Sequence, residues 1–204
     1  MSVRLGLKKI QGDPRSVLSA SCSLSLGAFL VGYRAVDSGL GPVLAALDDD
    51  VSGPDEARGW TRAYLSSRTE EEGLQKVLGA LLRILGSDAS WRPSPGPGAQ
   101  SSFVSFVRES IEQGRPGMVL AEPTLGYLFD FSQGYGYGLD AVNPDLASAQ
   151  RGRLAAFELW LQKQYSCSQA PWYGIVRVCE GACERGLLRF LQLWDEFERE
   201  VCGC

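Results

Sequence analysis

The 204-residue chain is long enough to bury one large hydrophobic core or two small ones. Its formal net charge of −4, with no basic stripe, excludes strong non-specific attraction to nucleic acid, and the absence of histidine excludes imidazole-dependent catalysis and metal binding. No apolar run approaches the roughly 18 residues that span a bilayer, and residues 1–10 lack the apolar core of a secretory signal. We therefore expect a cytoplasmic protein, outside the membrane, with reduced thiols.

An internal repeat is the most informative pattern, and it is visible from residue 12 onward at an offset of 102 positions. The identical residues are glycine, proline, aromatic and large aliphatic residues, which fix turns and cores. The pairs are Gly12 and Gly114, Pro14 and Pro116, Val17 and Val119, Leu18 and Leu120, Leu26 and Leu128, Phe29 and Phe131, Gly32 and Gly134, and Tyr33 and Tyr135. A later block recurs at a larger offset, with Trp60 opposite Trp172 and Glu71 opposite Glu184.

This repeat predicts a mainly α fold of two pseudo-repeated helical modules, each of about 100 residues with four or five helices. Residues 91–102 are rich in proline, glycine and serine, a composition typical of a connector with no means of packing. We therefore divide the chain into a degenerate first repeat over 1–90, a linker over 91–102 and a second repeat over 103–204. A duplicated module often imitates an ancestral homodimer, so we expect pseudo-two-fold packing of the halves, and a homodimer of the whole chain stays open.

Apolar residues spaced by three or four predict the helices. In the first half they are Leu74, Val77, Leu78, Leu81 and Leu85. In the second half they predict a short helix over Ser102–Ile111 and a helix from Leu125 to a turn region at Gly134. A third helix is predicted through Leu154, Phe157, Leu161 and Tyr165. A fourth is predicted through Leu187, Phe190, Leu191, Trp194, Phe197 and Val201. Val119 and Leu120 favour a short extended piece.

Motifs for cofactor or metal chemistry are weak. The Gly134–Gly138 stretch, Gly-Tyr-Gly-Tyr-Gly, lacks the residues of a phosphate-binding loop or a dinucleotide fingerprint, so we interpret it as a glycine-loosened helix that packs closely on a neighbour. The cysteines occur singly, at Cys22 and Cys167, or in pairs without the Cys-x-x-Cys spacing of zinc sites, at Cys179 with Cys183 and at Cys202 with Cys204. We expect no cofactor, no metal and no catalytic residue.

Acidic triplets and tryptophans are the candidate partner-binding residues. Asp48–Asp50 fit a solvated loop and Glu70–Glu72 a favourable helix N-terminus, but together they could form an acidic surface that meets a cationic partner. Trp160 and the two repeated tryptophans suit either the core or an interface hot spot. The candidates are Asp48, Asp49, Asp50, Glu70, Glu71, Glu72, Trp60 and Trp172.

The segment 115–120, Arg-Pro-Gly-Met-Val-Leu, precedes an apolar stretch containing Leu125, Leu128, Phe129, Phe131, Gly134 and Tyr135. This combination resembles a family of small bacterial proteins in which an Arg-Pro-Gly-Met-Tyr-Leu turn precedes a helix ending in Phe-Leu-x-Gly-Tyr. Phe157, Trp160, Trp172, Ile175 and the stretch 187–197 are also similar to that family. The likeness covers residues 103–200, and residues 3–86 show a less complete form of the same pattern. The sequence departs from the family at Val119, where the family usually has tyrosine.

Members of this family are frequently encoded beside polymorphic or contact-delivered toxins and resemble their immunity proteins. The resemblance implies a cognate protein toxin as partner and inhibition by occlusion of its active site, without catalysis. A regulatory or scaffolding interaction module is the alternative. An enzyme would need a carboxylate pair in a pocket, with Glu158 or Asp195 as candidates.

Overall fold

The computed structural model describes residues 3–20, 22–51, 69–87, 92–113, 123–167, 170–181 and 183–203, and the regular elements in these ranges are helices. The prediction of a mainly α fold is confirmed. The first half contains α1 (Val3–Gly12), α2 (Ser23–Val36), α3 (Gly41–Val51) and α5 (Glu70–Ser87). The second half contains α6 (Phe103–Glu112), α8 (Leu125–Val142), α9 (Pro144–Gln164), α10 (Trp172–Glu180) and α11 (Glu184–Cys202). Val119 and Leu120 lie outside the described residues.

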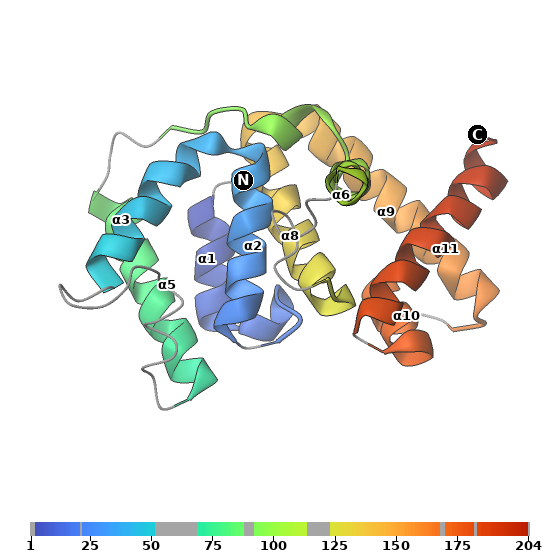
Figure 1. The fold of residues 1–204 in the computed structure, drawn as a ribbon, viewed down its shortest axis with the longest axis horizontal. Helices are drawn as coiled ribbons and strands as arrows, with labels where there is room; N and C mark the ends of the chain where they lie inside the picture. Colours follow the sequence, from blue (N-terminus) through green and yellow to red (C-terminus); the bar gives the residue numbers. More distant parts are fainter. Residues whose placement is uncertain are drawn as a thin grey trace.

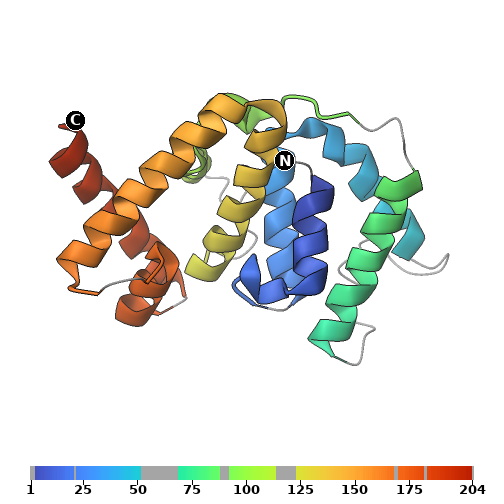
Figure 2. The same ribbon diagram turned by 180° about the vertical axis from the view of Figure 1, so that it is seen from behind.

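Helices α2 and α8 lie side by side at the centre of the molecule (Figures 1 and 2). The helices α1, α3 and α5 lie on one side of this pair, and α6, α9, α10 and α11 lie on the other (Figure 1). Helix α8 begins at a side-chain cap, because the Thr124 hydroxyl accepts a hydrogen bond from the backbone N–H of Tyr127 at 3.2 Å. Asn143 caps the following helix in the same way, through the N–H of Leu146.

Two glycines let α2 and α8 approach to backbone contact. A Cβ atom on Gly32 would overlap the carbonyl oxygen of Phe131, and a Cβ atom on Gly134 would overlap the carbonyl oxygen of Phe29. The two contacts are reciprocal, because Gly32 and Gly134 are 102 positions apart and so are Phe29 and Phe131. The turn expected at Gly134 is wrong, because α8 continues through it to Val142. The interpretation of Gly134–Gly138 as a helix packed closely on a neighbour is confirmed.

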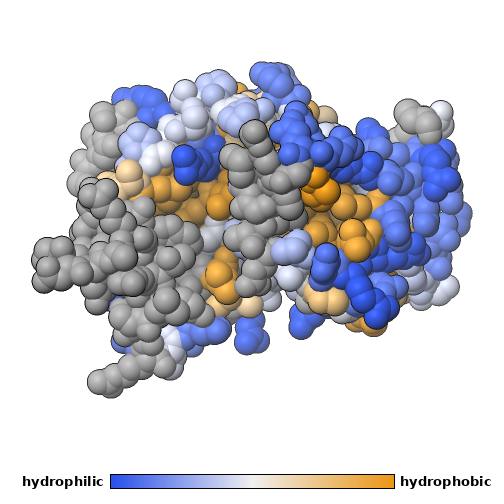
Figure 3. Space-filling model, in the orientation of Figure 1, coloured by the Kyte–Doolittle hydropathy of each residue, from blue (hydrophilic) through white to orange (hydrophobic). Residues whose placement is uncertain are grey.

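The buried side chains form two clusters, one on each side of the α2–α8 pair. The first cluster draws on α1, α2, α3 and α5, and the second draws mainly on α6 and α8–α11, with Ala28 and Val36 from α2. The apolar positions that predicted the last helix of each half are buried, with the exception of the partly buried Leu191 and the exposed Val201. The space-filling view shows apolar side chains surfacing mainly near the middle of the molecule, among hydrophilic ones (Figure 3). No helix in the described ranges has the length and hydropathy needed to cross a membrane.

The segment before α6 packs against the end of α2, so the expectation of a connector with no means of packing is wrong. The Gly96 N–H donates to the Val36 carbonyl at 2.6 Å, and Asp37 forms an isolated antiparallel bridge with Pro95. The Tyr135 hydroxyl reaches over from α8 and donates to the carbonyl of Gly98 at 2.6 Å. Glycine permits these approaches, because a Cβ atom at Gly98 would stand 2.7 Å from the Tyr135 hydroxyl.

Gly134→Ala is expected to lower the free energy of unfolding by about 2 kcal/mol or more, because the new methyl group must push α2 away from α8. Gly136→Ala on the same helix is the matched control, since nothing lies within 4 Å of the added methyl group. The control is expected to gain up to about 1 kcal/mol from helix propensity. Urea denaturation measures both values, and equal stabilities of the two variants would contradict the close contact.

Candidate functional site

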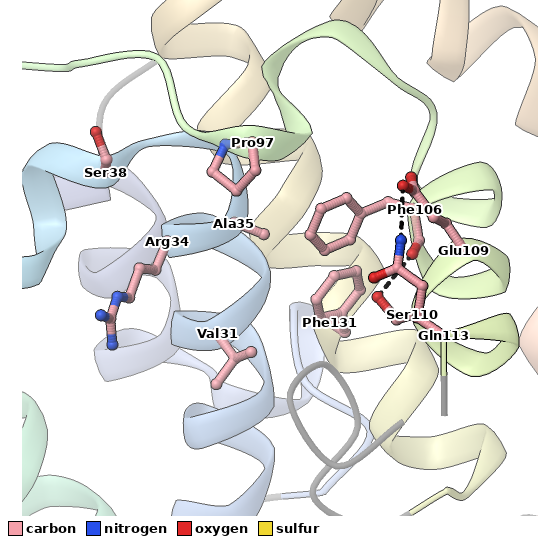
Figure 4. A pocket seen from close by; sticks show the side chains of 10 residues that line it. All are labelled: Val31, Arg34, Ala35, Ser38, Pro97, Phe106, Glu109, Ser110, Gln113 and Phe131. Atoms are coloured by element: carbon pink, nitrogen blue, oxygen red, sulfur yellow. Dashed lines mark hydrogen bonds between the residues drawn. The ribbon is translucent and has the colours of Figure 1, made fainter. Parts of the chain in front are cut away.

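An open groove of about 640 Å³ lies between α2, α6 and α8 and is the strongest candidate for a binding site (Figure 4). Helices α2 and α6 come from opposite halves of the sequence. The groove is lined by Val31, Arg34, Ala35, Ser38, Pro97, Phe106, Glu109, Ser110, Gln113 and Phe131. Apolar residues supply much of its inner surface and polar residues stand among them, a combination common in sites that bind ligands and protein segments.

Two aromatic rings form one wall of the groove. The rings of Phe106 and Phe131 are stacked, with centroids 6.3 Å apart and planes inclined by 12°. Both rings point toward α2 in Figure 4, where Val31 and Ala35 present only small side chains. Phe131, on α8, is fully buried, whereas Phe106 is half-buried. The ring of Phe106 is therefore the part of this wall that a bound molecule reaches first, and Phe131 supports it from beneath.

The polar residues at the groove differ in how they are bonded. On α6, the Gln113 amide donates to the Glu109 carboxylate at 3.0 Å, and the Ser110 hydroxyl donates to the Phe106 carbonyl at 2.9 Å. On α2, Arg34 is exposed and makes no ion pair with any residue that the structure describes. Arg34 is thus a cation at the groove that is available to a bound carboxylate.

A second polar cluster surrounds Asp130, a residue on α8 that is 1% exposed. Its carboxylate accepts hydrogen bonds from the backbone N–H of Ser19 at 2.5 Å and from the Ser19 hydroxyl at 2.7 Å. Burial raises the pKa of Asp130 to about 6. A smaller cavity of about 280 Å³ beside it also exposes Tyr173 and Arg177. Because both carboxylate oxygens are bonded to Ser19, the cluster fastens the segment before α2 onto α8.

The acidic triplets lie in the first half, on helices that pack against each other. Glu70, Glu71 and Glu72 form the exposed first turn of α5, as predicted, and the Thr69 hydroxyl accepts the Glu72 N–H at 3.1 Å. Asp48, Asp49 and Asp50 lie in the C-terminal part of α3, so the expected loop is wrong. Because Ala45, Ala46 and Leu47 favour helix, α3 continues through the triplet.

The tryptophans belong to the core where they are described. Trp172 is 4% exposed, and its ring centroid lies 4.7 Å from that of Phe190. Trp160 is 9% exposed, and its indole N–H donates to Glu200 at 2.8 Å. Trp60 lies outside the described residues. With its ring enclosed, Trp172 contributes to the packing of the second half and not to the described surface.

The two carboxylates considered for catalysis are not brought together. Glu158 accepts the backbone N–H of Trp172 at 3.3 Å at the start of α10, and Asp195 forms an ion pair with Arg108 at 2.5 Å. Neither lines the two cavities described above.

Cys183 stands exposed at the start of α11, where hydrogen bonds from the backbone N–H groups of Arg185 and Gly186 lower the pKa of its thiol.

Comparison of the chain with protein-family models, curated proteins and solved structures finds no match. Sequence reasoning missed the groove, because its walls come from segments about 70 positions apart and no local motif marks them.

Asp130→Asn tests the buried carboxylate through the pH dependence of stability. The folded-state pKa of about 6 exceeds the ordinary value of 3.8, so the folded chain binds this proton more tightly than the unfolded chain does. The stabilisation from this group is therefore complete below about pH 4 and is lost as the pH rises through 6. An asparagine side chain cannot titrate, so the variant is expected to lose a pH-dependent component of about 3 kcal/mol.

Urea denaturation between pH 4 and pH 7.5 measures this component. The exposed Asp145, in the first turn of α9, gives the control variant Asp145→Asn, which should follow the profile of the unaltered protein. Parallel profiles for Asp130→Asn and the unaltered protein would contradict the burial of a titrating carboxylate.

Proposed function

We propose that the chain is a non-catalytic immunity protein that binds a cognate bacterial toxin and neutralises it by occluding the toxin's active site. The observation that carries this proposal is the groove between α2, α6 and α8, in which an aromatic wall meets polar residues. Protein interfaces concentrate their binding energy in such apolar, enclosed centres with polar rims. Inhibition by occlusion needs a stable scaffold and a complementary surface, and no reactive group.

The link to immunity comes from the sequence pattern over residues 115–135. The part of this pattern that the structure describes lies on α8, where Phe131 forms the groove wall and Gly134 and Tyr135 hold α8 against α2 and the segment before α6. The pattern thus defines the scaffold around the groove. A cytoplasmic location is part of the proposal, because it suits a toxin that acts in the cytoplasm of its producer.

We also propose that the fold is a duplication, with the two modules related by a pseudo-two-fold axis between α2 and α8. The reciprocal contacts of Gly32 with Phe131 and of Gly134 with Phe29 support it, because a two-fold axis pairs equivalent residues in this crosswise manner. The order of elements supports it as well. In each half, a short first helix precedes the central helix, and a long amphipathic helix comes last.

The direct test is co-purification of the full chain with the product of the gene adjacent to its own, followed by measurement of mass and affinity. A stable stoichiometric complex, with loss of that product's toxicity, is expected. A stable complex with an ordinary cellular protein instead would replace the proposal with a regulatory or scaffolding module, and a toxin left active in the complex would contradict immunity.

Glu71→Lys is expected to lower the association rate with the toxin by about three- to tenfold at low salt, if the acidic end of α5 attracts a cationic partner. Glu184→Lys is the matched control, because Glu184 is the equivalent of Glu71 in the sequence repeat and is an exposed residue in the first turn of α11. Stopped-flow association at two salt concentrations measures the effect. An equal reduction for both variants would show general charge attraction and not a surface on α5.

A further inference from the structure

The central helices of the two halves differ at many equivalent positions, and one of these differences lies beside the groove. The offset of 102 pairs Ala35 on α2 with Tyr137 on α8, and it also pairs Phe29 with Phe131. In the first half, the Tyr137 ring packs on Phe29, with centroids 5.6 Å apart and planes inclined by 56°. The missing side chain of Gly6 on α1 makes room for both rings, since a Cβ atom there would lie 3.0 Å from Phe29 and 3.4 Å from Tyr137.

The junction of α1 with α8 is therefore filled by a phenol ring. At the corresponding junction of α6 with α2, Phe131 takes the place of Phe29, and Ala35 offers a methyl group in place of the phenol. The space left open is the groove, whose volume of about 640 Å³ is ample for an aromatic side chain. Phe106, on α6, stacks on Phe131 and keeps the wall aromatic.

We infer that the groove receives an aromatic side chain, tyrosine or phenylalanine, from a partner protein, in the position that the Tyr137 ring occupies in the other half. The inference rests on the proposed duplication and deepens the proposed function, because it names the chemistry that the partner presents. Aromatic rings prefer offset or tilted contacts with other rings, and the half-buried ring of Phe106, which stacks on the buried Phe131, can provide such a contact.

Two charged side chains line the groove, and they differ in what they can bind. The Glu109 carboxylate already accepts a hydrogen bond from Gln113, so the cation on α2 is the group that can attract a carboxylate of the partner. Arg34 lies one residue before Ala35 and is exposed, without an ion pair among the described residues. A guanidinium in this position favours a carboxylate next to the inserted ring, since Arg and carboxylate groups form paired hydrogen bonds. The occupant is thus a segment in which an aspartate or glutamate adjoins the aromatic residue.

The test uses the isotope-labelled full chain and two small probes, N-acetyl-tyrosinamide and N-acetyl-leucinamide, observed by NMR. Saturable shifts are expected at the amides of Val31, Ala35 and Phe106 with the tyrosine probe, and binding of the leucine probe should be at least fivefold weaker. An N-acetyl-aspartyl-tyrosinamide probe should bind more tightly than the tyrosine probe, and Arg34→Gln should remove that advantage. Equal binding of the tyrosine and leucine probes, or shifts only at other residues, would overturn the inference.

Ala35→Tyr supplies the decisive variant, because it places in the groove the side chain that fills the other half. The variant should keep the thermal midpoint of the unaltered protein or raise it, and binding of the tyrosine probe should fall at least tenfold. Ala155→Tyr, at an exposed position of α9 that does not line the groove, is the matched control and should leave binding unchanged. If the Ala35→Tyr variant does not fold, Val31→Tyr narrows the same groove and must likewise weaken binding of the tyrosine probe.

The outcomes separate this inference from the proposed function. If the chain binds the tyrosine probe but fails to neutralise any toxin, the groove is an aromatic-binding site and the proposed immunity function is wrong. Neutralisation of a toxin by the Ala35→Tyr variant, at the affinity of the unaltered protein, would leave immunity in place and remove the groove as the contact.

Discussion

The backbone contact between α2 and α8 is the constraint on which the rest of the structure depends. At Gly32 and Gly134 the two helices come so close that a single methyl group has no space. This contact joins the two hydrophobic clusters, which have no described residue in common. It also positions the polar side chains of α8, because Asp130 can bind Ser19 and Tyr135 can bind the Gly98 carbonyl only when α8 lies against α2. A local feature of two glycines thus positions segments from the whole length of the chain.

The groove results from a difference in side-chain size between the two sides of the α2–α8 contact. On one side of the central pair, Tyr137 packs on Phe29 beside α1 and fills the junction. On the other side, the small side chain of Ala35 stands where the sequence repeat pairs it with Tyr137, and Ala35 lines the groove together with Phe106 and Phe131. Because the groove is open to solvent, its apolar lining stays in contact with water, which favours a role in binding a ligand or partner over a role in stability. The proposed binding of a toxin gives this difference in side-chain size a function.

Periodic apolar positions allowed sequence analysis to predict the helices through Leu74 and Leu187, because burial of one helix face depends on local spacing. The glycine-rich stretch after Phe131 was interpreted correctly as a closely packed helix, although a turn at Gly134 was also expected. Other features depend on distant segments. Nothing near Gly98 in the sequence announces the Tyr135 hydroxyl that binds its carbonyl, and the groove becomes visible only when α6 is placed beside α2.

An immunity protein acts by stoichiometric binding and not by turnover. Titration of the toxin's activity with increasing amounts of the full chain, at concentrations well above the dissociation constant, distinguishes the two. If the chain occludes the toxin, activity falls linearly to zero at a fixed molar ratio and does not change further with time. Loss of activity at a small fraction of that ratio, increasing with incubation, would reveal catalysis and rule out occlusion, as would toxin activity that persists in an excess of the chain.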